Sequence, residues 1–298
     1  MSASGPPFFI VGSARSGTTL LRLMLNAHEK VAVPPESRFI VELWDGHEEV
    51  DIERLLKNLA AHKRFQAWDL PIDAVRHELE AARGKVKFAT VMEAAFGAYA
   101  RVNGKPRWGD KTPRYVEHIP FIAGLWPESK FIHLIRDGRN VALSYGNVPF
   151  GPKNVAQAAK LWADRVAMGC RDGRALATGH YIEIRYEDLV DDASGEAKDL
   201  CEFLELDFDP GMLDYTERAR DAVLTRASQF NPHLTEKPNK TRSWETEMPD
   251  KQVEVFETVA ADVLNELGYA RRFKSPSATA RMKATMGKLG LPIARLKS

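Results

Sequence analysis

Residues 8–26 read FFIVGSARSGTTLLRLMLN, and this stretch decides the fold. Its first four residues are apolar, a run too short for a helix and typical of a buried parallel strand. Gly12 and Gly17 bracket a polar turn, and the apolar run that follows predicts a helix. We therefore expect a strand, a tight turn and a helix that begins directly after Gly17.

The turn between the two glycines is suited to bind an anion. Backbone N–H groups at the start of a helix lack partners within the helix, and the helix dipole adds positive potential there. We expect the N–H groups of Ser16, Gly17, Thr18 and Thr19 to point out of this end. The sequence therefore predicts a phosphate-binding loop. The alternative is an ordinary strand-to-helix turn that happens to contain glycine and threonine.

This loop differs from that of nucleotide hydrolases in the position of its cation. Those enzymes have the pattern G-x-x-x-x-G-K-[ST], in which the lysine reaches the phosphates. Here Thr18 replaces the lysine, and Arg15 is the cation. The segment GSARSGTTLLRLML resembles the 5'-phosphosulfate-binding loop of sulfotransferases that use PAPS (3'-phosphoadenosine 5'-phosphosulfate). It is most similar to the RSGTT branch, which includes the tyrosylprotein sulfotransferases and their bacterial relatives.

A second segment, SKFIHLIRDGRNVALS at residues 129–144, matches the same family. It predicts a strand at 130–135, a turn, and the first turns of a helix. The resemblance implies that Arg136 and Ser144, eight residues apart, bind the 3'-phosphate of PAPS. A guanidinium offers phosphate a planar fork of donors and the hydroxyl adds another, so these residue types suit that role.

Glu36 is the candidate general base. It follows a short strand predicted at residues 31–33 and a proline pair, at a strand end where open α/β sheets bind ligands. The resemblance implies that Glu36, 21 residues after Arg15, removes a proton from the acceptor, and that Arg38 binds the acceptor. The alternative is that Glu36 is a carboxylate favoured by the dipole at a helix N-terminus.

Two histidines are rival bases, because another sulfotransferase branch uses histidine. His28 follows the first predicted helix, and His133 lies within a predicted core strand. Neither position matches the placement of the base in the RSGTT branch.

Lys111 is a further catalytic candidate. Pro113 limits helix continuation and Thr112 can cap the next helical turn, so we expect Lys111 at a strand end that faces the ligand crevice. The resemblance implies that Lys111 contacts the sulfuryl group and that Arg15 acts with it. The alternative is a surface lysine.

Three more residues are candidates for the nucleotide. Tyr186 follows a predicted strand at residues 180–185, and the resemblance implies that it approaches the nucleotide; the alternative is a core tyrosine. Residues 232–249 are polar and bounded by prolines, which predicts a loop. The resemblance implies that Lys240 and Arg242 in this loop close over the 3'-phosphate and adenine, and the alternative is solvated charge.

The remaining segments are predicted to be mostly helical. Residues 38–104 form helices that the resemblance implies are on the acceptor side. Apolar residues at helical spacing between Val253 and Leu267 predict one long helix that ends at Gly268. Four aromatic residues in the 38–104 segment either line an acceptor pocket or, as aromatic residues at this density usually do, belong to the core: Trp44, Phe65, Trp68 and Phe88.

Composition excludes several classes of protein. The chain has 298 residues, is 44% hydrophobic and has a formal net charge of +1, so it can form a sizeable core and gives no case for nucleic-acid binding. Cys170 and Cys201 are its only cysteines and belong to no metal-binding pattern, which argues against disulfides and zinc. There is no evident secretory signal and no apolar run of about 20 residues. We expect a cytoplasmic enzyme of bacterial type.

These features predict an α/β protein with a three-layer, P-loop-like fold: a mostly parallel central sheet flanked by helices. Residues 1–274 form a single domain, with the acceptor-side insertion at about 38–104. Residues 275–298 form a basic tail without acidic residues. This tail is predicted to rest on an anionic membrane or to contact another subunit, and the alternative is a mobile terminus.

The resemblance implies transfer of a sulfuryl group from PAPS to an acceptor hydroxyl or amine, with PAP (3'-phosphoadenosine 5'-phosphate) as product. No metal is required. The acceptor is a small molecule, saccharide, lipid or peptide, which the sequence does not distinguish. Two other functions stay open: a P-loop kinase or NTPase, and a non-catalytic protein that binds PAP or another nucleotide.

Overall fold

A five-stranded parallel sheet forms the centre of the protein. The computed structural model describes residues 5–82, 84–146, 148–214 and 243–291. The strand order is β2-β5-β1-β6-β7, and every neighbouring pair is parallel. Each strand lies where the sequence predicted one. The strands are β1 (Phe8–Val11), β2 (Val31–Ala32), β5 (Arg107–Lys111), β6 (Lys130–Ile135) and β7 (Tyr181–Arg185).

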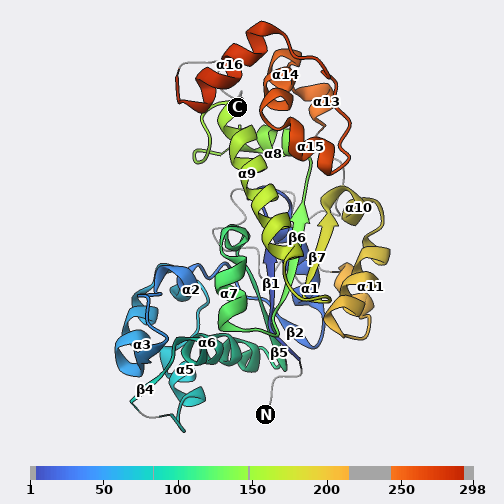
Figure 1. Cartoon of the computed structure of the whole chain (residues 1–298). Helices are drawn as coiled ribbons and strands as arrows, with labels where there is room; N and C mark the ends of the chain where they lie inside the picture. The colour runs from blue at the N-terminus through green and yellow to red at the C-terminus, as the bar shows by residue number, and fades with distance from the viewer. Residues whose placement is uncertain (1–4, 83, 147, 215–242, 292–298) are drawn as a thin grey trace.

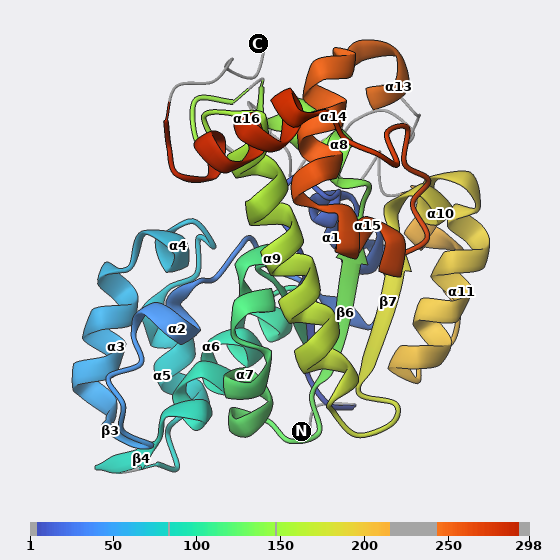
Figure 2. The same ribbon diagram turned by 45° about the horizontal axis from the view of Figure 1, so that its top comes forward.

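Helices cover both faces of the sheet (Figure 1, Figure 2). Phe8 and Ile10 of β1 pack with α1 and α11, whereas Phe9 and Val11 belong to the core on the opposite face with α6 and α7. The predicted three-layer α/β fold is confirmed. Of the helices that the structure describes, none is long and apolar enough to cross a bilayer. The flanking helices are α1 (Thr18–Ala27), α6 (Phe88–Val102), α7 (Ile119–Leu125), α9 (Val155–Arg174) and α11 (Ala193–Leu204).

Short elements follow several strands and helices. They bring polar side chains to the ends of the strands, and three of them adjoin the candidate site. They are the 3-10 helix η1 (Pro113–Glu117), α8 (Gly138–Tyr145), α10 (Tyr186–Asp191) and the 3-10 helix η2 (Pro210–Asp214).

The insertion between β2 and β5 is helical, as predicted, except for a small two-stranded sheet. Strands β3 (Glu49–Asp51) and β4 (Lys85–Lys87) pair antiparallel, and the sequence pattern did not predict them. Opposite charges face each other across this small sheet, Glu49 with Lys87 and Asp51 with Lys85, and such pairs stabilise short antiparallel strands. The helices before β4 are α2 (Phe39–Glu42), α3 (Ile52–Ala61), α4 (Lys63–Gln66) and α5 (Ile72–Glu78).

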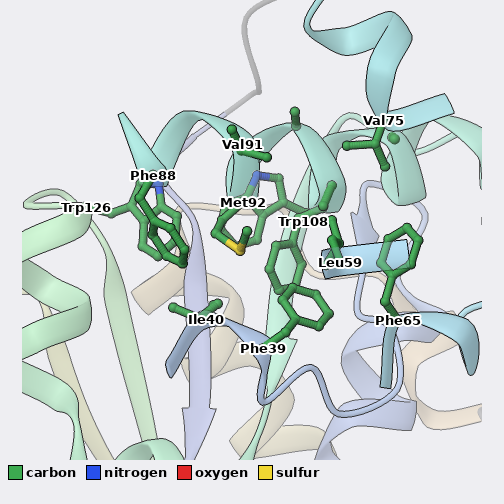
Figure 3. Close-up of a cluster of buried hydrophobic side chains, with 14 of the residues drawn as sticks. Phe39, Ile40, Leu59, Phe65, Val75, Phe88, Val91, Met92, Trp108 and Trp126 are labelled. Atoms are coloured by element: carbon green, nitrogen blue, oxygen red, sulfur yellow. The ribbon is translucent and has the colours of Figure 1, made fainter. Parts of the chain in front are cut away.

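An aromatic cluster joins this insertion to the sheet (Figure 3). Phe39 packs on Trp68 with ring centroids 5.1 Å apart, and Phe96 stacks on Trp108 of β5 at 4.5 Å. Phe65, Trp68 and Phe88 are buried, and Trp44 is partly buried against Phe88. The four aromatic residues weighed as pocket or core therefore belong to the core.

The carboxyl-terminal part differs from the prediction in two places. The single helix expected between residues 253 and 267 is interrupted at Ala260. Both segments turn their apolar residues to the same core, so the apolar periodicity of the sequence does not reveal this break. The predicted loop at 232–249 contains a one-turn helix that Ser243 caps, with Trp244 buried. The helices are α13 (Trp244–Glu247), α14 (Asp250–Val259), α15 (Ala261–Glu266) and α16 (Ala278–Lys288). Helix α16, in the predicted tail, packs on α9 and α14.

Arg139 of α8 connects the carboxyl-terminal helices to the rest of the fold. Its guanidinium donates to Glu257 Oε1 at 2.6 Å, Asp137 Oδ2 at 2.7 Å and the carbonyl of Ala270 at 2.8 Å. The side chains of Arg139 and Glu257 are 2% and 0% exposed. Glu257 also accepts a hydrogen bond from the backbone N–H of Phe273. A buried charge on α14 therefore depends on one arginine.

We expect Arg139→Met to lower the free energy of unfolding by about 3–5 kcal/mol, because Glu257 would stay buried without its counter-ion. Urea denaturation followed by circular dichroism measures this change. Lys160→Met is the matched control: Lys160 pairs with Asp164 on an exposed helix face, and such pairs contribute about 1 kcal/mol or less. Equal stability changes in the two variants would contradict the importance of the buried pair.

Candidate functional site

The predicted site residues that the structure describes gather at the carboxyl edge of the sheet. Parallel strands end at the same edge, which is where open α/β sheets bind ligands. The register pairs Ile10 with Lys111 and Val11 with His133, so the segments after β1, β5 and β6 begin side by side. The connection after β2, which contains Glu36, lies next to β5.

The glycine loop has the conformation that its sequence predicts. Gly12 has φ of 151°, and a Cβ there would lie 2.5 Å from the carbonyl oxygen of Leu134. Gly17 has φ of 94°, and a Cβ there would lie 2.3 Å from the ring of Tyr186. Arg15 adopts a left-handed backbone with φ of 74° although it is not glycine. Two neighbouring elements therefore leave no room for side chains at positions 12 and 17.

Donor groups meet at the start of α1. Gly17 is the N-cap residue of α1, and no side chain among the described residues accepts a hydrogen bond from the first N–H groups of this helix. The N–H of Ser16 was predicted to point out of the helix start, but it donates instead to the Ser13 carbonyl at 3.3 Å within the turn. The hydroxyls of Ser13 and Ser16 are buried and have no hydrogen-bond partner among the described residues. The loop can therefore offer hydroxyl and backbone donors to a phosphate or sulfate group.

Arg136 and Ser144, predicted to bind a 3'-phosphate, both contact Arg15. Arg15 Nε donates to Ser144 Oγ at 2.9 Å, and Arg136 Nη1 donates to the backbone oxygen of Arg15 at 3.5 Å. The guanidinium carbon of Arg136 lies 4.3 Å from the ring centroid of Tyr186. Arg136 Nε is buried without a hydrogen-bond partner among the described residues. Two loops predicted from separate motifs thus form one cationic cluster.

Glu36 lies at the centre of a second group of cations. Lys111 Nζ donates to Glu36 Oε1 at 2.8 Å, and the Lys111 side chain is only 5% exposed. The second carboxylate oxygen, Oε2, lies 3.8 Å from Arg38 Nε and 3.9 Å from Arg64 Nη1. The Glu36 side chain is 24% exposed, so one side of the carboxylate stays accessible. Lys111 is the last residue of β5, as predicted.

Opposing effects set the charge states of this pair. Burial raises the pKa of Glu36, but Lys111, Arg64 and Arg38 outweigh it and hold that pKa below its ordinary value. Burial lowers the pKa of Lys111, which Glu36 partly opposes. Glu36 is therefore a carboxylate at neutral pH and can accept a proton or a hydrogen bond.

Four side chains fix the segment that contains Glu36. Arg22 of α1 donates to the carbonyl of Val33 at 3.1 Å, and the indole N–H of Trp68 donates to the carbonyl of Pro35 at 2.8 Å. The Ser37 N–H donates to Thr112 Oγ1 at 3.1 Å, and the Ser37 hydroxyl lies 2.9 Å from the Tyr115 hydroxyl. These contacts hold the backbone on both sides of the carboxylate.

Asp110 is a buried carboxyl next to Lys111. Its side chain is inaccessible, and neither oxygen has a hydrogen-bond partner among the described residues. Burial raises the pKa of Asp110 to about 7. The hydroxyls of Thr112 and Ser37 lie near enough to limit this rise, although neither reaches hydrogen-bond geometry.

The two rival histidines lie apart from this group. His28 precedes β2, at the opposite edge of the sheet, and its Nε2 lies 3.0 Å from the Asp207 carbonyl oxygen. His133 is fully buried within β6, where its Nδ1 contacts the Tyr181 hydroxyl at 2.7 Å. Burial lowers the pKa of His133 to about 4. Across the described ranges, no group of three or more His, Cys, Asp or Glu residues could hold a metal ion.

Sequence reasoning missed several members of the site. Arg64 lies on α4 in the insertion, and no spacing within the sequence connects it to Glu36. Arg22 could have been identified from the sequence, because it is the one charged residue of the first helix. Lys240 and Arg242 were predicted to cover the nucleotide, and both lie outside the described residues.

Comparisons with known proteins show the family of this chain. Residues 6–210 match the family model described as the sulfotransferase family. The chain is 28% identical to nodulation protein NoeE of Sinorhizobium fredii over 287 residues, which is 88% of this chain and 65% of that protein. It is 23% identical to protein-tyrosine sulfotransferase A of Caenorhabditis elegans, over 92% of this chain and 70% of that protein. The chain thus spans about two thirds of the length of these relatives.

A solved structure supports the fold. The sulfotransferase domain from the curacin biosynthetic pathway matches with a TM-score of 0.58 and 22% sequence identity, and the match covers 91% of this chain and 100% of that domain. At this identity the likeness concerns the arrangement of helices and strands.

We expect Asp110→Asn to stabilise the protein at pH 8 but to have little effect at pH 4. The raised pKa means that the folded state keeps the proton while the unfolded state loses it, so native stability falls between about pH 4 and pH 7 and then levels off. About three pK units correspond to as much as about 4 kcal/mol. Urea denaturation of both proteins across this range measures the difference, and a stability gap that does not change with pH would contradict the buried, protonated carboxyl.

Proposed function

Because this chain belongs to the sulfotransferase family, we propose that it transfers a sulfuryl group from PAPS to a hydroxyl or amine of an acceptor, with PAP as the other product. The observation that carries this proposal is the proximity of two clusters at one edge of the sheet. Arg15, Arg136 and Ser144 form a cationic site suited to phosphates, and Glu36 with Lys111 forms a basic site beside it.

The loop residues would bind the donor. PAPS supplies an activated sulfuryl group on a 5'-phosphate, and the residues present fit such an anion because Ser13 and Ser16 offer buried hydroxyls without partners among the described residues. The backbone of Gly17, Thr18 and Thr19 would add N–H donors from the start of α1. These groups are fixed before the reaction, so they can stabilise developing charge without rearranging.

Arg136 and Ser144 would bind the 3'-phosphate. Arg136 Nε is buried without a partner in the described residues, and a charged phosphate would supply a bidentate acceptor. The face of Tyr186 fixes the guanidinium plane from one side. The donor would then extend from α8 across the glycine loop to Lys111.

Glu36 would act as the general base toward the acceptor. Lys111 occupies Oε1, whereas Oε2 meets Arg38 and Arg64 only at 3.8 and 3.9 Å and is free to receive a proton. The low pKa keeps Glu36 ionised before the reaction. The proton would move from the acceptor to Oε2 as the acceptor atom bonds to sulfur and the bond between sulfur and the 5'-phosphate oxygen of PAPS breaks. Lys111 and Arg15 would stabilise the negative charge that develops on the oxygen leaving with PAP. Arg38 would contact the acceptor beside this carboxylate.

We expect Glu36→Gln to reduce kcat by about 10²–10⁴-fold, which is the usual contribution of a general base, while PAP affinity stays within about twofold. A panel of phenolic, saccharide, lipid and peptide acceptors with radiolabelled PAPS first identifies an acceptor for the native chain. The same assay and calorimetry with PAP then compare the variant. Undiminished turnover by Glu36→Gln would show that Glu36 is not the general base. Magnesium-dependent ATP hydrolysis by the native chain without PAP binding would favour a P-loop NTPase instead.

We expect Arg136→Ala to weaken PAP binding by about 10–100-fold, because a hydrogen bond to a charged group contributes about 1.5–3 kcal/mol. The affinity for 5'-AMP, which lacks the 3'-phosphate, should not change. Calorimetry without magnesium gives both values. Arg114→Ala is a suitable control, since Arg114 is exposed and pairs with Glu117. If the affinities for PAP and 5'-AMP fall equally, Arg136 does not recognise the 3'-phosphate.

A further inference from the structure

Helix α16 has an unusual distribution of residue sizes. Its buried residues are all small, Ala280, Ala284 and Gly287, and they pack the helix closely against α9 and α14. Large apolar side chains would normally occupy this inner face of an amphipathic helix. The fully buried face of the helix therefore contains only small residues, and of its two methionines Met286 is half-buried and Met282 is exposed.

The outer face of α16 exposes apolar side chains instead. Met282 and Leu289, at the helix and its C-cap, are 55% and 72% exposed. They are seven residues apart, so they lie two turns from each other on one stripe opposite the buried alanines. Leu291 follows and is 46% exposed. Of the five large apolar side chains that are most exposed in the described residues, three thus lie within ten residues of each other.

Cations flank this apolar stripe on both sides. Arg281 and Lys288 lie on one flank at helical spacing and Lys283 lies on the other. Residues 275–298 contain no aspartate or glutamate, whereas the whole chain is nearly neutral at +1. The positive charge of this surface is therefore concentrated and is not offset by acidic neighbours along the helix.

The surface extends to the loop that precedes α9. Gln157 of α9 lies next to both segments, this loop and the end of α16. Its Oε1 accepts a hydrogen bond from the backbone N–H of Lys153 in this loop at 3.1 Å, and its Nε2 lies 3.8 Å from where a Cβ on Gly290 would be. The end of α16 thus adjoins the loop that contains Phe150, which is 50% exposed. Figure 1 shows α16 on the side of the molecule toward which strands β6 and β7 point.

We propose that α16 docks the protein on the surface of an anionic phospholipid bilayer. We name the contact the α16 face and define it by Arg281, Met282, Lys283, Lys288 and Leu289. Met282 and Leu289 would enter the boundary between headgroups and acyl chains, while the flanking cations reach the lipid phosphates.

The charge pattern favours a lipid surface over a second copy of the chain. A two-fold contact through the α16 face would bring Arg281, Lys283 and Lys288 of each copy toward the same residues of the other. Like charges in such a contact repel, and no acidic residue of α16 is present to pair with them. An anionic bilayer satisfies the apolar stripe and the cations together.

Vesicle binding by the full chain tests the electrostatic part. We expect binding to vesicles of phosphatidylcholine with added phosphatidylglycerol and much weaker binding to phosphatidylcholine alone, with a decline as salt rises. A cation near an anionic surface contributes about fivefold to the partition constant. The triple variant Arg281→Gln, Lys283→Gln, Lys288→Gln should therefore bind the mixed vesicles about a hundredfold less well.

The apolar part has a matched control. We expect Met282→Glu with Leu289→Glu to weaken vesicle binding by at least about tenfold, because each apolar side chain loses its burial and each new carboxylate is repelled. Val102→Glu introduces one carboxylate, where the double variant introduces two, at an apolar side chain that is 67% exposed at the end of α6 and outside the α16 face; it should bind like the native chain. All substituted side chains are exposed or at the surface, and thermal unfolding checks that each variant is folded.

Two outcomes would overturn the proposal. One is that both glutamate variants weaken vesicle binding equally. The other is that the native chain does not bind the mixed vesicles. If the native chain then forms a dimer in size-exclusion chromatography that Met282→Glu with Leu289→Glu dissociates, the α16 face belongs to a contact with a second copy.

Discussion

The ion pair between Lys111 Nζ and Glu36 Oε1, 2.8 Å long, is the interaction on which the site depends. It connects the end of β5 with the connection that follows β2, its neighbour in the sheet. Removing two charges from water is costly, and one close contact often fails to offset that cost. Arg38 and Arg64 add favourable charge around the carboxylate, so an ionised Glu36 persists at a half-buried position.

Parallel pairing explains why distant motifs form one site. Arg15 and Ser144 are 129 residues apart, and Arg136 is 121 residues from Arg15, yet Arg15 contacts both. They follow β1 and β6, which are adjacent and in register. Because parallel neighbours end at the same edge, any polar loop after one strand meets the loop after the next. The fold therefore brings together the residues that we propose bind phosphate.

Local patterns predicted the strands, the glycine loop and the placement of Lys111, because each depends on a few adjacent residues. Arg64 and Trp68 could not be found in this way, since they reach residues 35–36 only through packing of the insertion. The break at Ala260 leaves apolar periodicity unchanged on both sides and was missed for that reason. Strands β3 and β4 have three residues each, too short for an alternating pattern to stand out. Tertiary contacts rather than local propensities decide the features that were missed.

The site also combines features that oppose folding. Arg15 and Arg38 have left-handed backbones, and Asp110 is buried without a hydrogen-bond partner among the described residues. Such features each cost free energy and persist only where the surrounding structure fixes them. Here the fixation comes from fully buried strands on one side and from Tyr115 and Trp68 on the other. The rigid core thus holds charged and strained groups in one arrangement, which is the condition for electrostatic stabilisation of a transferring group.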